Sequence, residues 1–132
     1  MLLQKVGDSY GQGYDYLVLS KIESTLGNYL TAYDYCQHGK QYFESPIWLG
    51  YINAVLGRCY QIKGDITKAE IVLKQTLSLW STSNHIQGMS IAYKDLGNLY
   101  AFKSEYKQAQ VYLEQSLEVS KKLGYREGSI HA

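Results

Sequence analysis

Leu56-Gly57-Arg58-Cys59-Tyr60 returns forty positions later as Leu96-Gly97-Asn98-Leu99-Tyr100. The same offset carries Ala69 onto Ala109. Further pairs at this offset are Leu73 with Leu113 and Leu77 with Leu117. A fixed period of this size indicates supersecondary units that stack and share one continuous core. The repeat therefore predicts a solenoid, and it favours a binding function over catalysis.

The bulk composition excludes several classes of protein. The chain has 132 residues, enough for one domain but too few for two independent folds. Thirteen basic and twelve acidic residues give a net charge of +1, so bulk electrostatics favour neither nucleic acid nor a membrane surface as partner. No apolar run approaches the roughly 20 residues of a membrane span, and Met1-Leu2-Leu3 is too short for a signal peptide.

The two cysteines, Cys36 and Cys59, fall among apolar residues on predicted helices. In such places cysteine usually acts as a small hydrophobic residue. Without a framework of spaced cysteines, a reducing compartment is favoured, so the cytoplasm is the expected location. A disulfide between the two is the less favoured alternative.

Each unit is predicted to be two antiparallel helices joined by a tight turn. In the clearest unit the helices span about 86–103 and 106–122, because apolar residues recur there with helical spacing. Gly97 and Ala109 fall where two helices must approach closely. The inner stripe of the second helix is expected to be Tyr106, Ala109, Leu113, Ser116 and Leu117.

The preceding unit repeats this pattern, with helices at about 47–63 and 66–81. At its turn, Gly64 tolerates the left-handed conformation and Asp65 can cap the next helix. The first unit matches less well, because Ser20 and Glu23 stand where the later units have glycine and tyrosine. A glutamate at a helix contact is costly unless it is paired or reaches solvent.

The units are expected to span residues 12–45, 46–85 and 86–125 of a single domain covering 1–132. Residues 5–11 resemble the linker at 122–128. The repeats are therefore expected to be incomplete at both ends, with 126–132 beginning a truncated further repeat. Neither end resembles a capping helix, which favours a fragment of a longer array over a sequence that simply tapers off.

These residues resemble the tetratricopeptide repeat, whose consensus has Leu-Gly-x-x-Tyr, then Gly-Asp/Asn-Tyr at the turn, then Ala and a bulky apolar residue. The usual period is about 34 residues. The period of forty resembles a longer-helix subtype found in kinesin light chain, in the cell-polarity adaptor with Leu-Gly-Asn repeats and in bacterial signalling arrays. The resemblance implies an all-α, right-handed solenoid of about three antiparallel hairpins.

The resemblance also implies a concave groove, lined by the first helix of each hairpin, that takes an extended or helical peptide. Asn98 matches the family asparagine that hydrogen-bonds a ligand backbone, since an amide both donates and accepts. Lys21 and Arg58 stand at the equivalent position, and Lys94 lies one turn before Asn98. Such a basic wall suits an acidic or C-terminal carboxylate ligand. The alternative is that these cations are ordinary solvated residues, partly neutralised by Asp95.

Apolar contacts in the groove are expected from a second set of side chains. Aromatic residues make good interface anchors. Phe102 is the sharpest candidate because it follows a core residue and points away from the buried stripe, with packing against the next unit as its alternative. The full set is Tyr51, Ile62 and Phe102, with Tyr14 and Leu17 as weaker candidates.

The sequence carries no nucleotide-binding loop, zinc-ligand spacing or nucleophile motif. Cys36 and His38 lie two residues apart on a predicted helix and point to different faces, so they form a poor metal pair. His85 and His131 fall at linker or end positions, without an acid placed to orient them. The chain is therefore predicted to be no enzyme and to hold neither metal nor cofactor.

A protein-interaction module that binds a peptide in the groove is the leading functional hypothesis. A second hypothesis is a sensor or regulatory segment of a larger signalling or transcription-regulating protein. The third is self-assembly into a homo-oligomer, because uncapped terminal repeats expose apolar surface.

Overall fold

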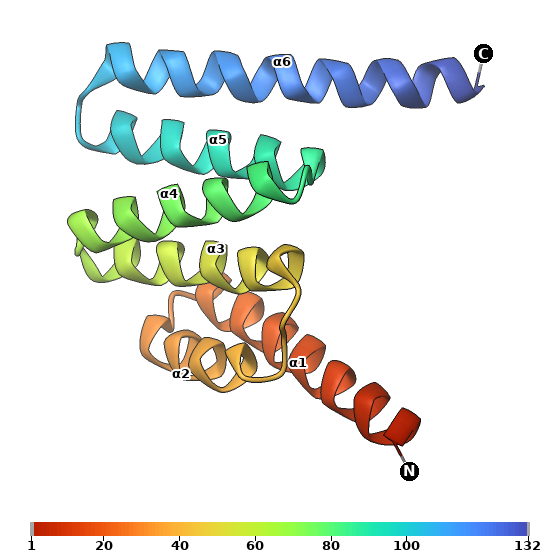
Figure 1. Cartoon of the computed structure of the whole chain (residues 1–132). Helices are drawn as coiled ribbons and strands as arrows, with labels where there is room; N and C mark the ends of the chain where they lie inside the picture. Colours follow the sequence, from red (N-terminus) through yellow and green to blue (C-terminus); the bar gives the residue numbers. More distant parts are fainter. Residues whose placement is uncertain (1, 132) are drawn as a thin grey trace.

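Within residues 2–131, six α-helices pair into three antiparallel hairpins that stack in chain order (Figure 1). This computed structural model describes residues 2–131, and it describes side-chain surroundings for residues 10–124. α6 lies at one end of the stack, and α1 with α2 at the other. The expected all-α solenoid of helical hairpins is confirmed. The helices are α1 (Leu2–Thr25), α2 (Tyr29–Lys40), α3 (Pro46–Lys63), α4 (Ile66–Thr82), α5 (Ile86–Phe102) and α6 (Tyr106–His131).

The turn inside each hairpin reverses the chain at one residue in the left-handed conformation. Gly27 (φ 84°), Gly64 (φ 94°) and Ser104 (φ 64°) hold this place in successive hairpins. At the second turn, the Gly64 amide donates to carbonyls of the last turn of α3, and Asp65 accepts from the Lys68 amide at 3.3 Å. The helix stop and restart expected at Gly64-Asp65 are therefore confirmed.

Glycines let the two helices of a hairpin touch. A Cβ added to Gly57 would lie 2.7 Å from Leu73, and one added to Gly97 would lie 2.6 Å from Leu113. The helices would have to separate to admit such a side chain, because protein interiors leave no spare volume. In the first hairpin the buried Ser20 takes the glycine's place, and its Oγ donates to a carbonyl one turn earlier at 2.7 Å.

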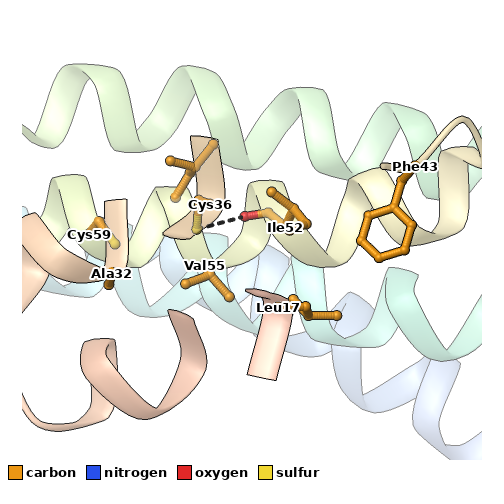
Figure 2. Close-up of a cluster of buried hydrophobic side chains, with 8 residues drawn as sticks. Leu17, Ala32, Cys36, Phe43, Ile52, Val55 and Cys59 are labelled. Atoms are coloured by element: carbon orange, nitrogen blue, oxygen red, sulfur yellow. Dashed lines mark hydrogen bonds between the residues drawn. The ribbon is translucent and has the colours of Figure 1, made fainter. Parts of the chain in front are cut away.

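The buried side chains form two clusters that follow the stack. Each cluster joins one hairpin to the next, so the core runs along the solenoid. The first joins α1, α2 and α3, and consists of Leu17, Ala32, Cys36, Phe43, Ile52, Val55, Leu56 and Cys59 (Figure 2). The second joins α4, α5 and α6, and consists of Ala69, Leu73, Leu96, Leu99, Tyr100 and Ala109.

Both terminal helices run through segments that were expected to be linkers. α1 is continuous through residues 5–11, and α6 continues through 122–128 to His131. Residues 126–131 therefore extend α6 and do not begin a new helix, while Ala132 lies outside the described residues. A glycine inside a helix costs only about 1 kcal/mol. A glycine-containing linker motif therefore ends a helix only where other contacts turn the chain back.

Among the residues expected in the inner stripe of the last helix, Leu113 packs against Gly97 of α5, but the stripe is only partly buried. Ala109 and Ser116 are buried. Tyr106, Leu113 and Leu117 are 68%, 39% and 56% exposed. The equivalent residues of α4 are covered by α5, whereas no described helix covers this side of α6. Apolar side chains at these repeat positions are buried only when the following hairpin packs on them.

Candidate functional site

The first helices of the three hairpins form one surface. α1 contacts α3, and α3 contacts α5, whereas α2, α4 and α6 make no backbone contact with one another in the described part of the chain. The hairpins therefore approach more closely on the side of α1, α3 and α5. We call the side chains on these helices that remain accessible there the A-helix face: Tyr14, Lys21, Tyr51, Arg58, Lys94 and Asn98.

The structure brings Lys21 and Tyr51 together across the junction of the first two hairpins. The Lys21 Nζ lies 5.8 Å from the centre of the Tyr51 ring, within range of a cation–π interaction. Tyr51 is held from behind, because its hydroxyl lies 2.8 Å from His85 Nε2 and its ring lies 5.0 Å from the Trp80 ring. Tyr51 therefore has a fixed orientation on the A-helix face.

At the next junction, Arg58 and Lys94 are exposed on neighbouring helices, with the half-buried Asp95 near both. Burial raises the pKa of the Asp95 carboxyl, while the Arg58 guanidinium and the Lys94 ammonium act in the opposite direction. Asp95 therefore offsets part of the positive charge, as its position in the sequence suggested. Asn98 is exposed one turn further along α5.

The apolar residues expected to line the groove differ in how far their side chains are exposed. Leu17 is only 2% exposed, so its assignment to the groove is wrong, because its side of α1 packs into the first core cluster. Tyr14 is 48% exposed. Ile62 is 42% exposed near the carboxyl end of α3, one turn beyond Arg58 on the same side of the helix.

Phe102 is 66% exposed at the carboxyl end of α5. It lines a cavity of about 520 Å³ with four residues of α4 and with Lys103. Lys103 is fixed there by Glu70 of α4, whose Oε1 accepts from the Lys103 Nζ at 2.9 Å. Phe102 therefore lies beside the second helix of the preceding hairpin, apart from the cations of the A-helix face.

Sequence reasoning missed an aromatic group at the amino-terminal half of this surface. The half-buried Trp48 contacts Tyr10 edge-on at 5.5 Å and Tyr14 at 6.0 Å, and it stacks on Phe43 at 5.7 Å. The spacing of Tyr10 and Tyr14, four residues apart on one helix, was the signal that could have revealed it. His85 was also expected to be an exposed linker residue, but it is half-buried against this group through Tyr51.

The architecture defines the class of this protein, an α-solenoid built from helical hairpins. The family model of the tetratricopeptide repeat matches residues 50–122, more than half of the chain. The chain therefore belongs to the tetratricopeptide repeat family. Such repeats are generally protein–protein interaction modules and are typically not enzymes. No curated protein matches this sequence.

Two other kinds of site are absent from the described part of the chain. None of the helices described here has the length and hydropathy needed to cross a bilayer. Among the described residues, no group of three His, Cys, Asp or Glu side chains is placed to hold a metal ion.

Proposed function

We propose that this protein binds an acidic peptide segment of a partner protein along the A-helix face. The observation that carries the proposal is the row of cations at the hairpin junctions, with Lys21, Arg58 and Lys94 all exposed on helices that contact one another in sequence. A ligand carboxylate placed against them gains charge-assisted hydrogen bonds. Asn98 continues the row with an amide that can pair with a ligand backbone.

The surroundings of Lys21 and Arg58 support distinct roles. Lys21 lies over Tyr51, so an aliphatic part of the ligand beside its carboxylate has an aromatic surface to pack against. Arg58 of α3 acts electrostatically on Asp95 of α5, and the Asp95 carboxylate weakens the attraction that Arg58 offers to an acidic ligand. On this proposal Ile62 and Phe102, each one helical turn beyond Arg58 and Asn98, lengthen the contact.

The test is fluorescence anisotropy with a labelled library of acidic peptides, beside a matched library in which Asp and Glu are replaced by Asn and Gln. We expect salt-sensitive binding of the acidic library, weakened about tenfold or more by Arg58→Glu, which reverses a charge at the centre of the row. Asp95→Asn should strengthen binding, since it removes the opposing carboxylate. Lys63→Glu, at the exposed end of the same helix, is the charge-matched control.

Binding that survives Arg58→Glu, or binding of both libraries alike, would refute the acidic-ligand proposal. Absence of binding with an intact circular dichroism spectrum would refute peptide binding on this face. In that case the regulatory segment of a larger protein becomes the leading alternative. The long-period subtype of the repeat and a cytoplasmic location also stay predictions.

Self-association is a second candidate, and one observation favours it. A cavity of about 340 Å³ lies on the side of α6 that corresponds to the side of α4 covered by α5. It is lined mainly by apolar side chains, together with Gln110 and Glu114. A helix of a second copy would bury this surface. Light scattering over a concentration series tests the idea, and a monomer at every concentration would exclude it.

A further inference from the structure

The two cysteines lie next to each other in the first core cluster, although 22 residues separate them in the chain. Cys36 comes from α2 and Cys59 from α3, and both side chains belong to the same buried cluster (Figure 2). Both are free thiols. The cysteine pair therefore lies at the junction between the first and the second hairpin.

Their surroundings differ. Cys36 is fully enclosed, and its Sγ lies 3.9 Å from the Ile52 carbonyl oxygen. Cys59 lines a cavity of about 240 Å³ that opens at the end of the hairpins. Three tyrosines contribute to its wall, and Lys63 and Lys68 are the charged residues that line it. A molecule of the size of water or hydrogen peroxide fits such a space.

The electrostatics also distinguish the two thiols. The Cys36 side chain lowers the pKa of Cys59, burial opposes that effect, and the Arg58 guanidinium lowers it further. The pKa of Cys36 is raised by Cys59 and by burial. Cys59 is thus the thiol that loses its proton first, while Cys36 keeps its proton. The thiolate is the reactive form of cysteine.

We propose that Cys59 and Cys36 form a dithiol that a small peroxide, entering through the tyrosine-lined cavity, oxidises to a disulfide between α2 and α3. The Cys59 sulfur attacks one peroxide oxygen, an S–O bond forms, the O–O bond breaks, and the leaving hydroxide takes a proton to become water. The Cys36 sulfur then attacks the Cys59 sulfur. The S–S bond forms, the S–O bond breaks, and the hydroxyl leaves as a second water with the Cys36 proton.

The test treats the folded protein with hydrogen peroxide, then unfolds it with N-ethylmaleimide and measures its intact mass. We expect a monomer that has lost two hydrogen atoms, about 2 Da, and carries no maleimide. Dithiothreitol should restore both maleimide adducts. The disulfide should form in a larger share of the folded protein than of the protein in urea, because only folding holds the two sulfurs in one cluster.

Two variants assign the roles. Cys36→Ser should hold Cys59 as a sulfenic acid that dimedone labels, whereas Cys59→Ser should leave Cys36 unmodified. Two maleimide adducts on peroxide-treated wild-type protein would overturn the proposal, as would disulfide-linked dimers as the main product. Equal oxidation of Cys36 in Cys59→Ser would also overturn it. The wild-type measurement decides the outcome even if one variant does not fold.

Discussion

α4 and α6 occupy the same place in successive hairpins, yet they differ sharply in burial. Leu73 of α4 is 2% exposed, whereas its equivalent Leu113 is 39% exposed. Trp80 of α4 is completely buried, whereas its equivalent Ser120 is exposed, with its Oγ 2.7 Å from the Ser90 Oγ. Both helices pack on the first helix of their own hairpin, but only α4 is also covered by the hairpin that follows. The neighbouring unit, more than the local sequence, decides which apolar side chains belong to the core.

The largest expected effect comes from shortening the two equivalent leucines. Leu73→Ala should destabilise the protein by about 3 kcal/mol, because it leaves a cavity between α3, α4 and α5. Leu113→Ala should cost about 1 kcal/mol, since solvent already reaches that side chain and less apolar area is lost. Urea denaturation with a common slope measures both changes. Equal losses would mean that α6 is covered in solution, which would also support self-association.

A smaller effect is expected at the turns of the same two hairpins. Gly64 and Ser104 both have positive φ, but only serine carries a Cβ that crowds the preceding backbone. Ser104→Gly should therefore stabilise the protein by about 0.5 kcal/mol, after the greater entropy of glycine in the unfolded chain is subtracted. The reverse change, Gly64→Ser, should destabilise it by about 1 kcal/mol. Thermal melting of the pair checks both signs, and a loss of stability in Ser104→Gly would contradict this account.

The smallest effect concerns His85, in the linker that follows α4. Burial lowers its pKa below the ordinary value of 6.5, so the folded state binds its proton less readily than the unfolded state does. The stability that depends on neutral His85 is complete above about pH 6.5 and is lost as the pH falls through the lowered pKa. The melting temperature should therefore fall with decreasing pH in this range, and the slope should be smaller in His85→Gln. His38→Gln, at an exposed site on α2, is the matched histidine control.

Much of the fold could be predicted from the repeat. The helix boundaries around Gly64-Asp65 agree with the sequence because a left-handed glycine and a capping aspartate act within a few residues. Gly97 marked a close helix contact for the same local reason, and Gly57 makes the equivalent contact in the preceding hairpin. The linkers expected at both ends were wrong, because a helix ends at such a motif only if tertiary contacts favour the turn.

The candidate site was predictable in part. The exposure of Lys21, Arg58 and Lys94 follows from their place on the helix face opposite the apolar stripe. The position of Lys21 over Tyr51 could not be foreseen, because it depends on how one hairpin stacks on the next. The position of Phe102 beside residues of α4 also depends on how the hairpins stack.

The sequence by itself determined the hairpin, its turns and the residues that face inward within each unit, because these depend on spacing along one helix and on backbone preferences over a few residues. Only the tertiary structure decided which hairpin covers which face, which cations share a surface and that Cys36 meets Cys59. Those contacts join residues from different units. Their geometry depends on the angle at which whole hairpins pack, which no local pattern specifies.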